Sequence, residues 1–478
     1  MRLRLLEQLR KHAHIRAEAP ALVAVASELS WNWAQVWLAC GRTAARVRQH
    51  VAPGRTVILC ASNSPEFVVA FAGILLAGCK VFPLTPECAG PELLAAARGC
   101  DAGGFIGSKD AAAILGAIWS MELDQVPLTR DIRNPMEADE MLDADDSSRV
   151  AMLLNSSGST GGPKIVHRDT RALNAVADAC VGAVGFEPMD QVLAAVPLCH
   201  SFGVEHGLLA PLSAGSCVHL CEAFEAGVVL KSLFGGVTIF PVVPFMAEAL
   251  SRASETIARP SALRQVYSAG APLAENVARA FAAQFGIQVG QVYGATEIGS
   301  VTFGDPISPN FNPASVGRAM AGVSIRISRA GEVEVKADSM FDRYLADEAG
   351  TSRITADGYF LTGDLGFLDS FGNLSIAGRL KLLIDVGGQK VNPLEVEKVL
   401  AEHPAVAECV VLPMPVSPTV TRLKAVVTAR AGLEVTPEML RSFAKERLSA
   451  FKVPRVIEIR NTLPRSSAGK VIRRLIES

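Results

Sequence analysis

The stretch from Asn155 to Lys164 combines hydroxyl side chains, glycines and a lysine, a set that suits a phosphate group. Glycines let backbone N–H groups approach an anion closely, and the hydroxyls and the ammonium add further donors. Pro163 precedes the lysine and Ile165 follows it, so the stretch departs from the P-loop of ATPases, in which a glycine and a hydroxyl residue flank the lysine. We predict a phosphate-binding loop of another kind after a strand over 150–154. The alternative is a glycine- and serine-rich surface loop.

Further polar and aromatic side chains follow other apolar runs that predict strands. His200 and Phe202 come after one such run, and Tyr293, Thr296 and Glu297 end or follow another. Ligands of parallel α/β sheets bind beyond the carboxyl ends of the strands, so these side chains lie where a site can form. The threonine offers a donor to phosphate, the glutamate a ligand for a divalent cation, and the tyrosine a ring face for a base. For His200 alone, the alternative is a core or loop histidine with satisfied hydrogen bonds.

The elements that position these residues alternate along the chain. Helices are predicted over 33–49, 64–77, 171–184 and 275–284, and strands over 56–61, 81–84, 191–196 and 288–293. This alternation predicts an α/β fold with a mostly parallel, doubly wound sheet. Residues 323–336 alternate around Arg329-Ala330-Gly331, which predicts a hairpin and therefore an antiparallel piece. The acidic, polar segment 131–148 predicts a linker loop.

Length and composition limit the possible functions. A chain of 478 residues is long for one core, so at least two domains are expected. A formal net charge of −2 provides no general attraction to nucleic acid or to an anionic membrane. The longest uncharged apolar runs, 67–79 and 232–247, are shorter than a bilayer span, and the start lacks the apolar block of a signal peptide. We expect a cytoplasmic protein with no nucleic-acid partner and no membrane span.

The cysteines are scattered rather than arranged as a disulfide framework. Their apolar surroundings predict buried free thiols. Cys217, His219 and Cys221 alternate and would share one face of a strand. Zinc would need a fourth ligand beside them, so we predict a structural strand there.

Seven motifs together carry a resemblance to a known family. They are SSGSTGGPK (156–164), PLCHSFG (197–203), SAGAPL (268–273), YGATE (293–297), YFLTGD (359–364), GRLKLLIDVGGQKVNPLEVE (378–397) and LPRSSAGK (463–470). The set resembles the adenylate-forming superfamily, which contains acyl- and aryl-coenzyme A ligases, peptide-synthetase adenylation domains and beetle luciferases. Because the motifs span most of the chain in the family's order, the chain is identified as a member, on the acyl/aryl-CoA ligase branch.

The resemblance implies a division into two domains. Residues 1–380 would form a large N-terminal domain of doubly wound sheets plus a β-barrel-like antiparallel piece, and 381–478 a small, mobile α+β domain. Lys381 matches the family's hinge position, about which the small domain rotates between two half-reactions. Gly387 and Gly388 match a tunnel for the thiol, where missing side chains admit a thin pantetheine arm.

The resemblance also implies how ATP is bound. The implied ATP-binding residues are Ser156, Ser157, Gly158, Ser159, Thr160, Gly161, Lys164, Gly270, Ala271, Pro272, Tyr293, Gly294, Ala295, Thr296, Asp364, Arg379 and Lys470. Tyr293 matches the ring that stacks on adenine, Thr296 the α-phosphate hydroxyl and Glu297 the Mg²⁺ ligand. Asp364 matches the carboxylate that accepts both ribose hydroxyls, which requires two lone-pair sites on one group. Arg379 matches the arginine on the ribose side.

The implied reaction has two halves. A carboxylate attacks the α-phosphorus of MgATP to give an acyl adenylate and pyrophosphate, and a thiol then displaces AMP to give a thioester. Lys470 matches the lysine that bridges the substrate carboxylate and the α-phosphate, where an ammonium lowers the repulsion between two anions. Thr296, Glu297 and His200 complete the implied catalytic set.

The acid itself is constrained by the residues near His200. The candidates for its pocket are His200, Phe202, Val204, Tyr267 and Gly270, with Leu208 and Val243 as further apolar wall residues. Phe202 occupies the position where the amino-acid-activating branch places an aspartate, and an unpaired α-ammonium against a ring is unfavourable. An aryl or medium-chain acyl acid is therefore expected. Glu205 and His206 are expected to point into solvent; alternatively, Glu205 binds an amino or hydroxyl group of an aromatic acid.

The acceptor thiol has two candidates. Free coenzyme A is expected, and the phosphopantetheine arm of an acyl carrier protein is the alternative, because both would use the same tunnel. A luciferase-type oxygenase shares the fold, and a non-catalytic nucleotide-binding scaffold is disfavoured because Lys470, Thr296, Glu297 and Asp364 occur together. The expected oligomeric state is a monomer or a homodimer.

Overall fold

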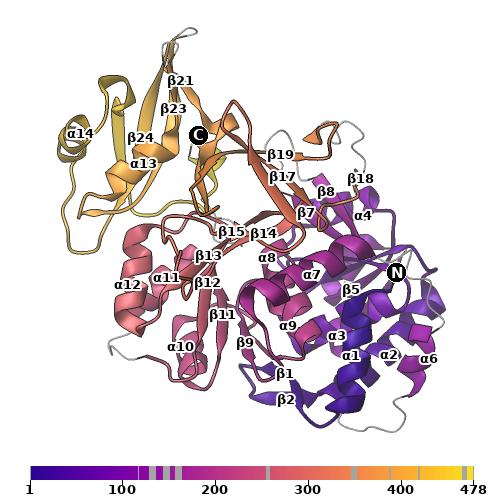
Figure 1. Cartoon of the computed structure of the whole chain (residues 1–478). Helices are drawn as coiled ribbons and strands as arrows, with labels where there is room; N and C mark the ends of the chain where they lie inside the picture. Colours follow the sequence, from indigo (N-terminus) through magenta and orange to yellow (C-terminus); the bar gives the residue numbers. More distant parts are fainter. Residues whose placement is uncertain are drawn as a thin grey trace. The chain divides into compact units, whose positions relative to one another are not determined.

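A computed structural model gives the fold (Figure 1). It describes residues 2–116, 118–128, 136–143, 151–156, 164–253, 259–345, 353–386, 389–417, 420–465 and 471–476. The chain divides into a first unit, Met1–Ile325 with Val335–Phe360 and Phe371–Asn373, and a second unit, Arg326–Glu334 with Leu361–Ser370 and Leu374–Ser478. The predicted domain boundary between 380 and 381 stays a prediction.

The larger of the first unit's sheets is mainly parallel. Within the described residues it contains nine strands, in the order β15 (Arg318–Ala319), β14 (Gly299–Gly304), β13 (Val289–Ala295), β12 (Gln265–Ser268), β11 (Ile239–Val242), β9 (Gln191–Ala194), β10 (Cys217–Leu220), β1 (Pro20–Ala24) and β2 (Leu29–Asn32). The strands from β13 to β1 pair in parallel, and the strands at both edges pair antiparallel. The carboxyl ends of the central strands therefore share one edge, where ligands of such sheets bind.

A second sheet of the first unit has the same mixed character. Its seven strands in the described part of the chain are β18 (Arg343–Leu345), β8 (Lys164–Asp169), β7 (Ala151–Ser156), β4 (Lys80–Leu84), β3 (Thr56–Cys60), β5 (Ala102–Gly107) and β6 (Trp119–Glu122). β7, β8 and β18 form the antiparallel side. β3 is buried along its whole length, with Val57 and Leu59 in one core and Ile58 and Cys60 in another. Burial of both faces explains why this strand is a continuous apolar run.

Helices form a layer between the two sheets. α3 (Pro65–Leu76) contacts β3, β4 and β1, and α7 (Thr170–Val184) contacts β7, β8 and β14 (Figure 1). α3 is apolar on all sides, as expected for a helix covered on every face. α10 (Ala226–Phe234), α11 (Pro244–Ala253) and α12 (Glu275–Phe285) cover the other face of the nine-stranded sheet through a second apolar core.

An antiparallel piece follows the two large sheets. It is a four-stranded sheet of described residues, in the order β16 (Val323–Ile327), β17 (Glu332–Ala337), β19 (Phe360–Leu368) and β20 (Leu374–Arg379). The turn between β16 and β17 is closed by a hydrogen bond from the Ser328 N–H to the Glu332 carbonyl, 2.9 Å long. The predicted hairpin over 323–336 is therefore confirmed.

The second unit contains a small α+β core. β23 (Val406–Ser417), β24 (Val420–Ala429) and β25 (Val456–Arg460) form its sheet, and α13 (Pro393–Ala401) and α14 (Pro437–Lys445) pack against it. The expected fold class, α/β with a smaller α+β C-terminal part, is confirmed.

The predicted elements agree with the structure in most places. α2 (Trp33–His50), α3, α7 and α12 match the predicted helices within about two residues. The linker prediction over 131–148 is wrong for Met136–Asp143, which forms helix α6. Ala138 and Leu142 lie one turn apart and are buried, and an added Cβ at Gly41 of α2 would lie 2.5 Å from the Cβ of Ala138. Close packing on α2 therefore stabilises a helix whose other side is acidic.

The cysteine predictions can also be compared with the structure. The cysteines are free, and all except Cys88 and Cys409 are buried. Cys217 and His219 lie in strand β10, as predicted, and His219 hydrogen-bonds through Nε2 to Gln191 Oε1 at 2.8 Å. Among the described residues, no helix combines the length and the apolar composition that a bilayer crossing requires.

Candidate active site

The predicted phosphate loop is framed by two paired strands. β7 and β8 are antiparallel, and Ser156 at the end of β7 is the register partner of Lys164 at the start of β8. Residues 157–163, which include Ser157, Gly158, Ser159, Thr160 and Gly161, lie outside the described residues. The frame fixes where the two ends of this loop begin.

The YGATE motif forms the turn of a second antiparallel hairpin. Tyr293, Gly294 and Ala295 end β13, and the N–H of Ile298 donates to the carbonyl of Ala295 at 3.1 Å. An added Cβ at Gly294 would lie 2.3 Å from the Gly299 carbonyl oxygen, so this close approach requires glycine. Thr296 and Glu297 occupy the partly exposed turn.

One tyrosine links these two hairpins. The Tyr344 hydroxyl donates to Glu297 Oε1 at 3.0 Å, and Lys164 Nζ lies 4.9 Å from the centroid of the Tyr344 ring. Tyr344 belongs to β18, which pairs with β8 so that Leu345 faces Ile165. The structure therefore brings together the lysine and the carboxylate that the sequence analysis assigned to phosphate and to Mg²⁺. The sequence analysis missed Tyr344, because nothing in the local sequence indicates this pairing.

An asparagine that the sequence analysis also missed holds the loop before His200. Asn63 Nδ2 donates to the carbonyls of Ala194 and Val196, both at 3.0 Å, and its Oδ1 accepts from the Leu198 N–H at 2.8 Å. His200 then precedes the short helix α8 (Ser201–Val204) and its carbonyl accepts from the helix. Asn63 follows β3 of the other sheet, so its position at a strand end was the available signal.

The SAGAPL motif begins at the last residue of β12 and continues into the turn after it, as predicted. Gly270 has φ +86°, a left-handed conformation that glycine adopts without strain, and Gly270, Ala271 and Pro272 are exposed. The structure thus presents this predicted ATP-binding segment at a strand end.

The predicted ribose-binding pair lies in the second unit. Asp364 on β19 and Arg379 on β20 are register partners, and Arg379 Nε donates to Asp364 Oδ1 at 2.6 Å. Asp364 is buried whereas the Arg379 side chain is 55% exposed. The two residues assigned to one ribose thus face each other across a strand pair.

Of the remaining predicted residues, some lie within the described residues and some lie outside them. Lys381 is within the 3₁₀ turn Leu380–Leu382, and Gly387 and Gly388 lie outside the described residues between the paired strands β21 (Ile384–Val386) and β22 (Gln389–Val391). Lys470 also lies outside. Arg473, shortly after it, donates to the Glu397 carboxylate at 2.8 Å and to the Val411 carbonyl at 2.8 Å.

The candidates for the acid pocket differ in exposure. Val204, Leu208, Val243 and Tyr267 are buried, Phe202 and His200 are half-buried, and Gly270 is exposed. The Phe202 ring centroid lies 5.0 Å from that of His206 and 6.2 Å from that of Tyr267. Phe202 is therefore the candidate aromatic ring at the boundary of the core.

The expectation that Glu205 and His206 point into solvent is wrong, because both side chains are fully buried. They begin a π-helical segment, Glu205–Leu209, that continues α8 and turns both side chains inward. Glu205 forms an ion pair with Arg168, whose side chain is equally buried. Among the described residues, Nε and Nη2 of Arg168 have no hydrogen-bond partner, so Glu205 is the main compensation for this buried charge.

The Glu205 carboxylate accepts hydrogen bonds on both oxygens. Oε1 accepts from Arg168 Nη1 and from Ser201 Oγ at 2.6 Å, and Oε2 accepts from the N–H and the hydroxyl of Ser300 at 2.9 and 2.6 Å. Burial would raise the pKa of Glu205, but the charge of Arg168 and these hydrogen bonds outweigh burial and lower it. These donors occupy the carboxylate, so the alternative in which Glu205 binds a substrate substituent is also disfavoured.

His206 belongs to the same buried cluster. Its Nδ1 lies 3.0 Å from the Tyr267 hydroxyl and its Nε2 lies 3.0 Å from Ser300 Oγ. Burial lowers the pKa of His206 to about 4, so the ring is neutral at neutral pH. Cys180 Sγ lies 3.5 Å from Nε2.

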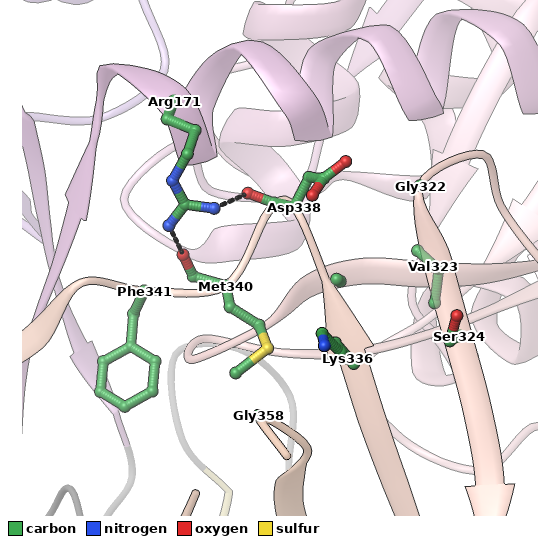
Figure 2. Close-up of a pocket in the computed structure, with 10 residues that line it drawn as sticks. Arg171, Gly322, Val323, Ser324, Lys336, Asp338, Met340, Phe341 and Gly358 are labelled. Atoms are coloured by element: carbon green, nitrogen blue, oxygen red, sulfur yellow. Dashed lines mark hydrogen bonds between the residues drawn. The ribbon is translucent and has the colours of Figure 1, made fainter. Parts of the chain in front are cut away.

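A separate open cavity of about 620 Å³ lies beside the segment that follows β17. Figure 2 shows Arg171 donating there to the carbonyl oxygens of Asp338 and Met340. Phe341, which also lines it, donates its N–H to the Glu297 carbonyl at 2.7 Å. The residues that line this cavity include none of the sequence-predicted site residues, so it is a neighbour of the candidate site rather than the site itself.

Comparison with known proteins agrees with this geometry. The sequence model of the AMP-binding enzyme family matches residues 9–345, and that of the AMP-binding enzyme C-terminal domain matches residues 395–470. The chain belongs to the AMP-binding enzyme family.

The relatives within this family include acid–CoA ligases. A sulfoacetate–CoA ligase of Cupriavidus necator is 31% identical over 369 residues, which are 73% of this chain and 70% of that protein. The crystal structure of ATP-bound MatB from Rhodopseudomonas palustris has a TM-score of 0.89 at 25% identity, covering 100% of this chain and 98% of the other. O-succinylbenzoate coenzyme A synthetase (MenE) from Bacillus subtilis, in complex with ATP and magnesium ion, has a TM-score of 0.85 at 26% identity, covering 98% and 99%.

The buried ion pair leads to a prediction about stability. Glu205→Gln leaves the guanidinium of Arg168 buried without its counter-charge, and we expect a loss of about 3–5 kcal/mol in the free energy of unfolding, measured with urea. The double variant Arg168→Met/Glu205→Leu is the control. It removes both charges. Its loss in the free energy of unfolding should be clearly smaller than the sum of the losses of Arg168→Met and Glu205→Leu measured singly. A single variant as stable as the wild type would contradict this role.

His206 gives a prediction about pH. The folded-state pKa of His206 is about 4, below the ordinary value of 6.5. As the pH falls below 6.5, the unfolded chain binds a proton that the folded chain does not bind, so the free energy of unfolding decreases. Lowering the pH from about 7.5 to about 5 should therefore cost the wild type about 2 kcal/mol more than it costs His206→Gln. Urea unfolding of both proteins at the two pH values measures the difference. Equal losses would show that His206 does not titrate in this way.

Proposed function

We propose that the protein is an AMP-forming acid–CoA ligase, which activates a carboxylic acid with MgATP and transfers the acyl group to the thiol of coenzyme A. The observation that carries the proposal is the Lys164–Tyr344–Glu297 contact between the two hairpins. It joins a cation suited to phosphate with a carboxylate suited to a divalent cation. Similarity to a sulfoacetate–CoA ligase and to an o-succinylbenzoate–CoA synthetase supports a thioester product.

In this proposal the first unit binds the phosphates and the acid. Lys164 and the hydroxyls of the phosphate loop bind the β- and γ-phosphates, Thr296 binds the α-phosphate, and Tyr293 stacks on the adenine. Glu297 would hold Mg²⁺, and its partly exposed position at a turn fits that role. The metal would neutralise charge that develops on the phosphates. The Tyr344 hydrogen bond fixes one oxygen of Glu297 and so orients the carboxylate.

The second unit supplies two further functions in this proposal. Asp364 accepts the ribose hydroxyls, and the hydrogen bond from Arg379 orients its carboxylate. Lys470 neutralises the two anions that meet during adenylation. Residues 381–478 would act as the mobile domain, with Lys381 as its hinge and Gly387-Gly388 at the thiol tunnel.

The substrate assay determines the acid and the acceptor thiol. An aryl or medium-chain acyl acid is expected because the candidate wall near Phe202 is aromatic and aliphatic. The phosphopantetheine arm of a carrier protein is the second candidate acceptor, since the same tunnel would admit it.

The function is tested by measuring pyrophosphate release with MgATP for benzoates, cinnamates, fatty acids and amino acids, with and without coenzyme A. We expect sustained release with an aryl or medium-chain acid only when coenzyme A is present. Release that stops after about one equivalent, whether or not coenzyme A is present, would favour a carrier protein as the acceptor, because the adenylate then stays bound. The absence of release with every acid would contradict the proposal.

The role of Lys470 is tested by separating the half-reactions. Lys470→Ala should lower adenylation at least about a hundredfold, because one cation that stabilises the transition state is lost. Thioester formation from a supplied acyl adenylate should be retained. Lys398→Ala, which removes an exposed lysine of α13, is the matched control and should leave both half-reactions unchanged. Equal loss of both halves in Lys470→Ala would contradict the assigned role.

A further inference from the structure

The segment 338–344 fixes the backbone of the turn that carries Glu297. The Phe341 N–H donates to the Glu297 carbonyl at 2.7 Å, and the Ser339 hydroxyl donates to the carbonyl of the residue after Glu297 at 2.6 Å. The segment is fixed in turn by Arg171 of α7, which donates to two of its carbonyl oxygens (Figure 2). The backbone position of Glu297 is therefore set, and the direction of its carboxylate is set separately.

One oxygen of the Glu297 carboxylate is occupied and the other is available. Oε1 accepts from the Tyr344 hydroxyl at 3.0 Å. Within the part of the chain that the structure describes, Oε2 has no hydrogen-bond or ion-pair partner, and the residue is partly exposed. A carboxylate oxygen in this state fits Mg²⁺, which prefers oxygen ligands and is usually bound through one or two carboxylates.

The same tyrosine contacts Lys164 through its ring. Lys164 Nζ lies 4.9 Å from the centroid of the Tyr344 ring, within the range of a cation–π contact. A ring face attracts an ammonium without the full negative charge that a carboxylate would bring. This contact therefore holds the lysine in place and leaves its positive charge to attract a phosphate oxygen.

Tyr344 is held in place by the protein itself. Its strand β18 pairs with β8, where Val166 is its register partner, and its ring centroid lies 4.7 Å from that of Phe341. The residue is 5% exposed. Its neighbours therefore fix the ring and the hydroxyl, and Tyr344 acts through Glu297 and Lys164 rather than on a ligand.

We propose that Tyr344 is a positioning residue that prepares the site for MgATP in two separate ways. Its hydroxyl directs the Glu297 carboxylate so that Oε2 binds the divalent cation, and its ring directs Lys164 toward the phosphates. Because opposite charges attract, a residue that contacts both of them also keeps them from neutralising each other. The inference rests on the proposed function and deepens it, since it names the residue through which the cation site and the phosphate site are both set.

The test measures nucleotide binding rather than turnover. The Kd of ATP is determined by calorimetry on the full chain, once with excess Mg²⁺ and once with EDTA, and the ratio of the two values gives the effect of the metal. Tyr344→Phe keeps the ring and removes the hydroxyl. We expect the effect of the metal to fall about tenfold, the loss that follows when a partner of a metal-binding group is removed, while the Kd in EDTA stays the same.

A second variant tests the ring, and a third serves as the control. Tyr344→Leu removes the ring as well as the hydroxyl, so it should also weaken ATP binding in EDTA, by about threefold or more, because Lys164 loses its cation–π partner. Arg343→Lys is the matched control. It changes an exposed side chain of the same strand on the opposite face and keeps its charge, so both Kd values should be unchanged.

A double-mutant cycle separates positioning from a general structural effect. Glu297→Gln removes the candidate metal ligand and should by itself reduce the effect of Mg²⁺ on ATP binding. If Tyr344 acts through Glu297, adding Tyr344→Phe to this variant should cause little further loss, whereas a structural defect would add its full loss. Additive losses would overturn the inference.

These measurements contain no acid, so they are independent of acid activation. Pyrophosphate release with any acid, together with an effect of Mg²⁺ that falls less than about threefold in Tyr344→Phe, overturns the inference and leaves the proposed function intact. No release with every acid, together with a loss in Tyr344→Phe that Glu297→Gln abolishes, supports the inference while the proposed function fails. A wild type that binds ATP equally with Mg²⁺ and with EDTA overturns the inference whichever acids are activated.

Discussion

The contact between strand β8 and the hairpin of β13 and β14 is the constraint on which the first unit's site depends. It is made twice. At one end, Lys164 of β8 approaches Tyr344, which donates to Glu297 at the turn of the hairpin. Four residues further along, Arg168 reaches Glu205, which accepts from Ser300 of β14. Side chains two and four residues apart on a strand share a face, so one face of β8 carries both cations.

These two contacts work in different dielectric environments. The outer contact is partly exposed, so its residues can exchange partners with a ligand at modest cost. The inner pair is fully buried, where separating the charges is far more expensive. β8 is therefore anchored at its buried end and leaves its lysine available at the other. The segment predicted to bind phosphate joins β7 to β8 at that available end.

The sequence predicted well what depends on local patterns. The helices and strands of the first unit follow from hydrophobic periodicity, and the motif order identified the family and most candidate residues. Glu205 and His206 were predicted wrongly because polar side chains among apolar neighbours were expected to turn into solvent. Their partners lie 37, 95 and 61 residues away, at Arg168, Ser300 and Tyr267. Tyr344 was missed for the same reason, since it acts through a contact between strands that no local pattern reveals. Asn63 lies just after a strand, but its partners are more than 130 residues away.

Burial of Glu205 changes what this carboxylate can do beside the residues predicted to bind the acid. A carboxylate at the pocket wall would bind a substrate amino group directly and would also pay a large desolvation penalty whenever the pocket closed without one. Here the carboxylate is withdrawn behind His206 and Ser300, and its charge is compensated by Arg168. The hydrogen bonds continue from Ser300 through His206 to Tyr267. The ion pair that anchors β8 is therefore surrounded by its own hydrogen-bond partners in the core.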